Sequence, residues 1–299
     1  MASKASDNGS PSDRIERMYS SLLKKYGPQG WWPLSGRKRT KGAEDKPLHC
    51  PKHRNGPPLD DNDRFEIIVG AILTQNTNWK NVEKAIANLN AADILNARKI
   101  QKADVKRIAE LIRPAGYYNQ KAERLKIASD FFSSHFKNRT VPSRAELLQV
   151  KGIGPETADS ILLYAFGVPT FVVDTYTKRI FSGLGVLKAG SDYERIRKLF
   201  MEAFKTSETK EKVKIFKEYH ALIVEHAKTH YSRKPYGTGC PLIGPFRQSE
   251  NNENQPLGAI LGLKAEVLRS SPKRLIFGIK NCAINGGVSH PAQFLMTKE

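Results

Sequence analysis

The sequence predicts an all-α fold, and two patterns carry that prediction. From about residue 64 to residue 248, apolar residues recur almost continuously at the three- and four-residue spacing of amphipathic helices. Strand-like alternation of apolar and polar residues is scarce along the same stretch. Glycine and proline interrupt the helical pattern at several places, which we interpret as the boundaries between successive helices. They lie at residues 113–114, 141–142, 152–155, 167–169, 183–185 and 235–239.

The two ends of the chain and one internal segment differ from this helical body. Residues 1–12 are small and polar, and we expect them to form a disordered basic tail. Helical spacing over residues 13–26 predicts a first amphipathic helix that Gly27 ends. Residues 35–62 show no periodicity and are rich in Lys, Arg, Pro and Gly, which is typical of a basic loop. The folded domain is therefore expected to span residues 13–248, followed by a C-terminal extension (249–299) to which we assign no role.

Composition narrows the classes of function. The 299 residues include 49 Lys and Arg against 30 Asp and Glu, a formal net charge of +19, and the mean hydropathy is −0.50. Such a chain can bury a core, and its basic balance favours polyanionic partners. No apolar run is long enough to span a bilayer and the N-terminus has no apolar signal segment, so a membrane or secreted protein is not expected. The well-separated cysteines, Cys50, Cys240 and Cys282, give no support to a disulfide framework.

A glycine-rich turn between two helical patterns is the first motif with chemical meaning. Residues 147–165 read LLQVKGIGPETADSILLYA, with Gly152 and Gly154 in the turn. Two glycines let backbone N–H groups approach a phosphate closely, and a helix that starts at Pro155 adds its positive dipole end. The pattern predicts a helix-hairpin-helix that binds a nucleic-acid backbone without reading its sequence. A Gly-x-Gly turn can also be a simple helix cap, so this motif alone is weak.

An aspartate that follows the hairpin makes the pattern more specific. The apolar segment 171–173 leads into Asp174 at the start of another predicted helix. A carboxylate at that position is most often an N-cap. A hairpin followed by Val-Asp-Thr, however, resembles the helix-hairpin-helix (HhH-GPD) DNA glycosylase superfamily, which includes endonuclease III and the adenine glycosylases. The resemblance implies that Asp174 is catalytic and that two helical lobes enclose a basic cleft for an extruded nucleotide.

This resemblance runs from about residue 13 to residue 242 and implies a set of DNA contacts. In the segment ILTQNT, Gln75 matches the glutamine that members of the family insert where a base has been extruded, and Asn76 allows for a shift of one residue. The further residues expected at the DNA backbone are Lys151, Gly152, Gly154, Lys178, Arg179 and the basic loop residues 37–41. From the sequence alone, the helical pair 178–179 is equally typical of a solvated surface.

One departure from the family pattern bears on the reaction. Members that also nick the strand carry a lysine nucleophile two residues after the second hairpin glycine, and this chain has Glu156 there. A carboxylate cannot form a Schiff base with the sugar, so we expect a monofunctional glycosylase. Asp174 would stabilise the cationic sugar or activate a water molecule. Lys151 is an alternative amine, although its position before the glycines suits a phosphate contact better.

A second departure concerns the iron-sulfur cluster of endonuclease III. The cluster spacing, projected onto this chain, falls on four residues: His230, Gly237, Cys240 and Phe246. A cluster needs thiolates, and only Cys240 supplies one, so we expect no cluster and no other cofactor. The segment 49–53 offers at most three ligands, whereas structural zinc takes four. We therefore predict no metal site.

The N-terminal aromatic pair indicates which base is removed. Adjacent tryptophans are often packing anchors. In combination with the motifs above, however, the sequence Trp31-Trp32-Pro33 resembles the 3-methyladenine DNA glycosylase branch, which implies a pocket where a cationic alkylated purine stacks on aromatic rings. Glu156 at the pocket rim would favour such a cation. Lys228 falls where this branch carries a pocket lysine, although a positive group would not itself attract a cation.

The sequence thus favours a monofunctional DNA glycosylase that releases alkylated purines such as 3-methyladenine from double-stranded DNA. We expect a monomer that works inside the cell, wherever the genome is, without contact with a membrane. One alternative is an endonuclease III-like glycosylase and lyase acting on oxidised pyrimidines. Another is a non-catalytic binder of damaged DNA, although such a binder has little need for a carboxylate at Asp174 facing a polyanion.

Overall fold

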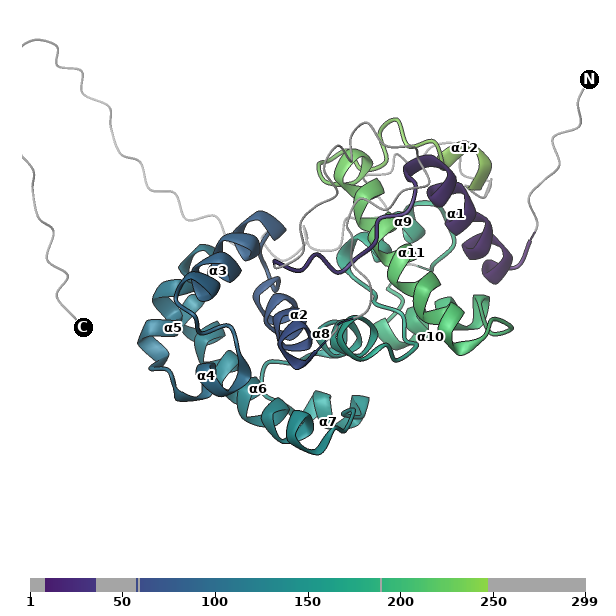
Figure 1. Cartoon of the computed structure of the whole chain (residues 1–299). Coiled ribbons are helices and arrows are strands. Elements are labelled where there is room, and N and C mark those ends of the chain that lie inside the picture. Colours follow the sequence, from purple (N-terminus) through teal and green to yellow (C-terminus); the bar gives the residue numbers. More distant parts are fainter. Residues whose placement is uncertain (1–8, 36–57, 59, 189, 247–299) are drawn as a thin grey trace, which may run out of the picture. The chain divides into compact units, whose positions relative to one another are not determined.

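Within the residues that it describes, the computed structural model is entirely helical apart from turns and loops (Figure 1). It describes residues 9–35, 58, 60–188 and 190–246. All of these belong to a compact unit, Met1–Leu261, and the second unit, Gly262–Glu299, lies outside the described residues. So do the predicted extension 249–299 and nearly all of the predicted basic loop. The all-α prediction is confirmed.

The first helix, α1 (Pro11–Tyr26), begins earlier than the sequence pattern suggested. Ser10 caps it: the Ser10 hydroxyl accepts the Asp13 N–H at 3.2 Å, and the Asp13 carboxylate accepts the Ser10 N–H at 2.9 Å. This reciprocal pair satisfies two backbone donors, and Pro11 suits the first helical position. Residues 9–12 are therefore part of the capped helix start and not of a disordered tail, and only residues 1–8 of the predicted tail lie outside the described part.

One group of helices forms the first lobe. It consists of α2 (Asp61–Leu73), α3 (Trp79–Ala91), α4 (Ala97–Lys102), α5 (Val105–Leu111), the 3-10 turn η1 (Arg113–Ala115), α6 (Tyr118–Asn138) and α7 (Arg144–Gln149). Helices α4 and α5 pack on α6, and α3 packs on η1. The buried Lys121 of α6 donates to the carbonyl oxygens of Leu73 and Ala115, each at 2.9 Å. These bonds fix the end of α2, and burial lowers the pKa of Lys121 to about 8.

The second lobe brings the first helix together with the later part of the chain. It contains α1, α9 (Thr175–Gly183), α10 (Tyr193–Ala203), α11 (Thr209–His230) and α12 (Ile243–Phe246). Helix α1 packs on α10 and α11, and α9 packs on α11. Buried Arg14 connects α1 to the ends of α9 and α12, because its guanidinium donates to the carbonyl oxygens of Leu184, at 2.8 Å, and Phe246. Among the described helices, none combines the length and apolar content needed to cross a bilayer.

The predicted hairpin joins the two lobes. Helix α8 (Pro155–Ser160) continues into a π-helical turn, η2 (Ile161–Ala165). The π-helical turn η2 packs against α2 of the first lobe and α11 of the second, and helix α8 contacts α7 (Figure 1). Because this segment is buried between both lobes, the residues at its start are held in a fixed relation to α9 and α11.

Candidate active site

Asp174 is the N-cap of α9, and its two carboxylate oxygens have different surroundings. Oδ1 accepts hydrogen bonds from the backbone N–H and the hydroxyl of Thr177, both at 2.7 Å. Among the described residues, no side chain or backbone group donates to Oδ2, and the side chain keeps 13% of its surface exposed. One oxygen therefore fixes the helix start, and the other is available for chemistry.

His220 of α11 lies beside the available oxygen. Its Nε2 atom is 3.8 Å from Asp174 Oδ2, and its Nδ1 atom is 2.8 Å from the hydroxyl of Tyr164 on η2. Burial lowers the pKa of the imidazole, while the negative charge of Asp174 works in the opposite direction. With the pKa lowered overall, the ring is neutral at physiological pH.

Glu156 contributes a second carboxylate at the start of α8. Its pKa is raised to about 7 by the surrounding protein and by the charge of Asp174, whereas Lys178 lowers it. The side chain is nevertheless exposed, so solvent screens these charges and limits the energy that the shift represents. The charge of Asp174 contributes to this raised pKa, which indicates that the two carboxylates are close enough to interact.

The tryptophan pair reaches this site from the segment after α1. Trp31 is half-buried and meets the His220 ring edge-on, with ring centres 5.8 Å apart. Trp32 is buried and contacts Tyr164, with ring centres 5.1 Å apart. Pro33 follows them and is half-buried. Glu218 holds this segment, because its carboxylate accepts the N–H groups of residues 29 and 30.

Gln75 is hydrogen-bonded to the hairpin, and Asn76 is exposed. The Gln75 side-chain nitrogen donates to the carbonyl oxygen of Gly152 at 2.9 Å and to the hydroxyl of Thr157 at 3.0 Å. Asn76 follows with a left-handed φ of 54°. Gly154 caps α8 without a side-chain hydrogen bond, which leaves the first N–H groups of that helix available to an anion.

The predicted basic residues occupy different surroundings. Lys151 and Lys178 are exposed, and Lys178 influences Glu156 as described above. Arg179 is half-buried: its guanidinium donates to the carbonyl oxygen of Tyr231 at 2.5 Å and lies 4.0 Å from the centre of the Tyr236 ring. Lys228 is exposed and pairs with Glu225 on its own helix at 3.1 Å. No described contact joins Lys228 to the tryptophan pair or to Asp174.

The segment after α11 does not fit an iron-sulfur cluster. Of the projected ligand positions, only Cys240 offers a thiol, and its sulfur lies 3.2 Å from His226 Nε2 and 3.4 Å from the Tyr231 hydroxyl. Phe246 and Gly237 carry no ligand atom in their side chains, and the His230 ring is engaged with a backbone carbonyl at 3.1 Å. Since such a cluster needs several thiolates, this donor set cannot hold one. Within the described residues no other group of His, Cys, Asp and Glu side chains forms a metal site, and the segment 49–53 lies outside them.

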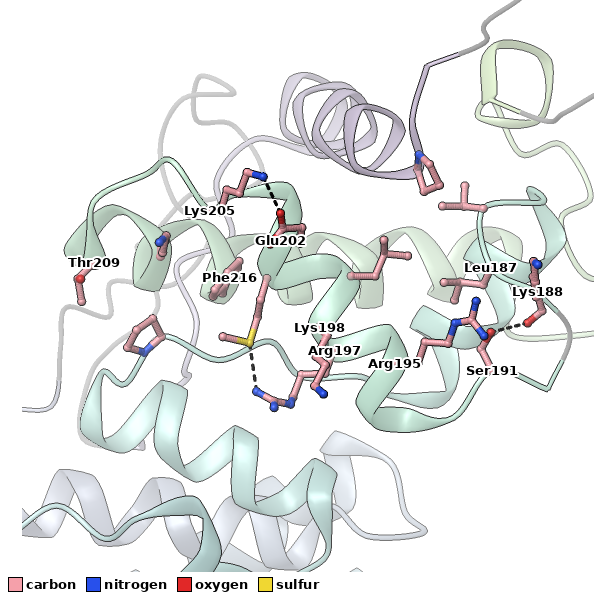
Figure 2. Close-up of a pocket in the computed structure, with 16 residues that line it drawn as sticks. Leu187, Lys188, Ser191, Arg195, Arg197, Lys198, Glu202, Lys205, Thr209 and Phe216 are labelled. Carbon is pink, nitrogen blue, oxygen red and sulfur yellow. Dashed lines mark hydrogen bonds and ion pairs between the residues drawn. The ribbon is translucent and has the colours of Figure 1, made fainter.

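A cavity of about 840 Å³ along α10 is separate from these residues (Figure 2). Its lining includes Arg195, Lys198 and Phe216, and Arg197 extends toward the sulfur of Met201, 3.1 Å away. None of the predicted site residues lines it. The size of this cavity is therefore no guide to the chemistry.

Two residues of the site, His220 and Tyr164, were missed by sequence reasoning. His220 falls on the buried face of α11 together with Phe216 and Ile223, where a histidine is usually a core residue. Tyr164 reads as an ordinary apolar position of the helix after the hairpin. The available signal was a titratable residue on an otherwise apolar helix face, and only the fold shows that it faces Asp174.

The fold and this site define a helix-hairpin-helix protein with a carboxylate at a helix start next to the hairpin. A family model described as "HhH-GPD superfamily base excision DNA repair protein" matches residues 69–206. The chain is also 43% identical, over 77% of its length, to a Methanocaldococcus jannaschii protein provisionally named a DNA repair glycosylase, of which 94% is covered. The chain therefore belongs to the HhH-GPD superfamily of base excision DNA repair proteins and is a DNA repair glycosylase of that superfamily.

Further relatives and solved structures are also DNA repair enzymes to which this chain is similar. Endonuclease III of Sulfolobus acidocaldarius is 31% identical, with 60% of this chain and 79% of that protein covered. The structure of H. pylori 3-methyladenine DNA glycosylase (MagIII) bound to 1,N6-ethenoadenine gives a TM-score of 0.56 at 29% identity, covering 74% of this chain and 98% of that one. A trapped endonuclease III–DNA covalent intermediate gives a TM-score of 0.60 at 19% identity, covering 79% and 96%, which shows the shared fold.

Proposed function

We propose that this protein is a monofunctional glycosylase that hydrolyses the N-glycosidic bond of alkylated purines, such as 3-methyladenine, in double-stranded DNA. The observation that carries this proposal is the combination of Asp174, whose Oδ2 accepts no hydrogen bond from the described residues, with Glu156 at the position where lyases of the family have lysine. The likeness to MagIII, whose structure contains 1,N6-ethenoadenine, supports a modified purine as the substrate.

Release of an alkylated purine requires little catalytic assistance from the site. Alkylation gives the purine a positive charge, so the base leaves as a neutral molecule and needs no acid to protonate it. Asp174 supplies negative charge where the sugar becomes cationic as the bond breaks. The aromatic face of Trp31 and the carboxylate of Glu156 both favour a cationic ring over a neutral one. No cluster or metal is needed for this reaction.

The absence of a lysine at position 156 supports hydrolysis without strand cleavage. Lys151, the alternative amine near the hairpin, is exposed and has no described contact with Asp174, which argues against its acting as the nucleophile. We therefore expect the reaction to stop at the abasic site.

Base release from methylated duplex DNA tests this proposal, with the Asp174→Asn variant and borohydride trapping run in parallel. We expect the wild-type protein to release 3-methyladenine, the variant to lose this activity, and no covalent complex to form with borohydride. A trapped complex on abasic DNA or on DNA with oxidised pyrimidines would instead favour the bifunctional alternative. Tight binding of damaged duplex without release of any base would favour the non-catalytic one.

A further inference from the structure

His220 Nε2 and Asp174 Oδ2 lie 3.8 Å apart, and we call the space next to both atoms the gap. At 3.8 Å they are too far apart for a direct hydrogen bond. Asp174 Oδ1 is already occupied by Thr177, so Oδ2 is the oxygen left for another partner. A water oxygen at about 2.8 Å from both atoms fits this separation.

The hydroxyl of Tyr164 determines which nitrogen of His220 carries the proton. That hydroxyl donates its single proton to the carbonyl oxygen of Lys217 at 3.2 Å. With its proton directed to Lys217, the hydroxyl accepts at its 2.8 Å contact with His220 Nδ1, and this arrangement assigns the hydrogen of the neutral ring to Nδ1. In the neutral ring Nε2 then carries a free lone pair, and Asp174 Oδ2 lies 3.8 Å from it. Two acceptors facing one gap match the two hydrogens of a water molecule.

The surroundings of the gap suit a reacting water better than a structural one. The side chains of His220 and Asp174 retain 9% and 13% of their surface, so neither is completely sealed from solvent. Trp31, the residue proposed to stack on the base, contacts the His220 ring edge-on. The gap is thus bordered by the same residues that we assign to the base and the sugar.

We propose that His220 and Asp174 together hold the hydrolytic water and that His220 Nε2 is the base that takes its proton. This inference rests on the proposed glycosylase function and adds a catalytic residue to it. A lone pair of the water oxygen forms the new bond to the sugar carbon C1′ while the C1′–N bond breaks and its electron pair leaves with the base. One water proton moves to Nε2, and the Asp174 carboxylate stabilises the resulting imidazolium.

Single-turnover base release by His220→Ala, with and without added imidazole, tests the role of the histidine. We expect the rate constant to fall by about 100-fold, the lower range for loss of a general base. Imidazole should restore at least a tenth of the lost rate in a concentration-dependent way. Binding of duplex DNA that contains a non-cleavable abasic analogue should stay within about threefold of wild type.

A pair of matched tyrosine variants tests the proton arrangement even if His220→Ala folds poorly. Tyr26 contacts Nδ1 of His226 on the same helix α11 at the same 2.8 Å. Tyr164→Phe removes the acceptor for Nδ1–H, so the proton shifts to Nε2 and the water loses one acceptor, which should slow base release by about tenfold or more. Tyr26→Phe makes the same chemical change away from Asp174 and should leave the rate within about twofold.

The outcomes separate the inference from the proposed function. Rates of His220→Ala and Tyr164→Phe within threefold of wild type would overturn the water site while leaving the glycosylase function intact. A slow His220→Ala protein that imidazole does not restore, with DNA binding and thermal stability lowered in parallel, would assign His220 to packing and also overturn it. If the wild-type protein releases no base, the proposed function fails, and the water site fails with it.

Discussion

The side-chain amide of Gln75 donates to the carbonyl oxygen of Gly152 at 2.9 Å, which ties the turn after α2 to the hairpin. The same nitrogen donates to the Thr157 hydroxyl, and the amide oxygen accepts from Arg124 at 2.6 Å. The Gln75 amide is therefore fully engaged in this form of the protein. If Gln75 is to enter the space left by an extruded base, as the sequence predicts, it must first release the hairpin.

Replacement of Gln75 by alanine should therefore affect the fold as well as DNA binding. The substitution leaves the Gly152 carbonyl and the Thr157 hydroxyl without a partner, so we expect the free energy of unfolding to fall by about 1–3 kcal/mol. Urea unfolding measures this quantity. Asn76→Gly is the matched control, because it removes an exposed side chain while keeping the left-handed backbone accessible, and it should stay within about 0.5 kcal/mol. If both variants changed the free energy of unfolding equally, the hydrogen bonds between Gln75 and the hairpin would contribute nothing to stability.

The two hairpin glycines should respond differently to alanine. At Gly154 an added Cβ meets nothing within 4 Å and φ is −90°, so the free energy of unfolding should change by about 1 kcal/mol or less. The same methyl group occupies the approach of a phosphate to the start of α8, and we expect duplex affinity to fall by about five- to tenfold.

At Gly152 we expect alanine to lower the stability of the fold, in contrast to Gly154. Its φ is +91°, and an added Cβ would lie 2.5 Å from Cδ of Arg124, so alanine should destabilise the fold by about 1–3 kcal/mol. Thermal unfolding and fluorescence anisotropy with labelled duplex separate the two effects. A Gly154→Ala protein that binds DNA like wild type would rule out close backbone–phosphate contact at this position.

Much of the fold follows from local signals in the sequence. The helices between residues 60 and 246 follow apolar spacing, and the turn around Gly152 and Gly154 follows glycine and proline chemistry, so both could be predicted. The start of α1 was misjudged because its capping box uses Ser10 and Asp13 in a segment that is otherwise polar.

The site was only partly predictable because it depends on contacts between distant parts of the chain. Asp174 was identified through the neighbouring hairpin. His220 lies beside Asp174, which is 46 positions earlier in the chain, and Glu218 accepts the N–H of residue 30, which is 188 positions earlier. No local sequence pattern encodes contacts between such distant residues. The sequence also assigned Lys228 to the pocket, and only the fold reveals its exposed pairing with Glu225.

Glu156 should make stability depend on pH. Its pKa in the folded protein is raised to about 7 from an ordinary value of 4.5, so the folded state binds more protons than the unfolded state between these values. The stabilising contribution is fully present below about pH 4.5 and is lost as the pH rises through about 7. We therefore expect Glu156→Gln to be more stable than wild type at pH 8 and nearly equal to it at pH 4.

Thermal unfolding of both proteins across this pH range gives the measurement. Lys178→Ala serves as a companion variant, because it removes the charge that lowers the Glu156 pKa and should move the loss of stability to higher pH. A difference between wild type and Glu156→Gln that stays constant from pH 4 to pH 8 would contradict the raised pKa.

Asp159 connects the hairpin helix to the segment that carries Asp174. Its fully buried carboxylate accepts two hydrogen bonds from Arg144, at 2.9 and 3.1 Å, and one from the Tyr193 hydroxyl at 2.8 Å. The Tyr193 oxygen in turn accepts the N–H of Val173, the residue before Asp174, at 3.4 Å. Burial and the adjacent carboxylate raise the pKa of Tyr193, so its hydroxyl keeps the proton that it donates.

Substitution of these two aspartates by asparagine should separate stability from activity. Asp159→Asn takes away the negative charge that Arg144 faces in this network, while the pairing of Arg144 with Glu194 remains, so the free energy of unfolding should fall by about 1–3 kcal/mol. Asp174→Asn keeps a competent N-cap, so the loss should be about 1 kcal/mol or less while base release disappears. Urea unfolding and base release measured on both proteins test this contrast. If Asp159→Asn unfolds like wild type, the network does not support the segment before Asp174. If Asp174→Asn retains base release, the carboxylate is not the catalytic group.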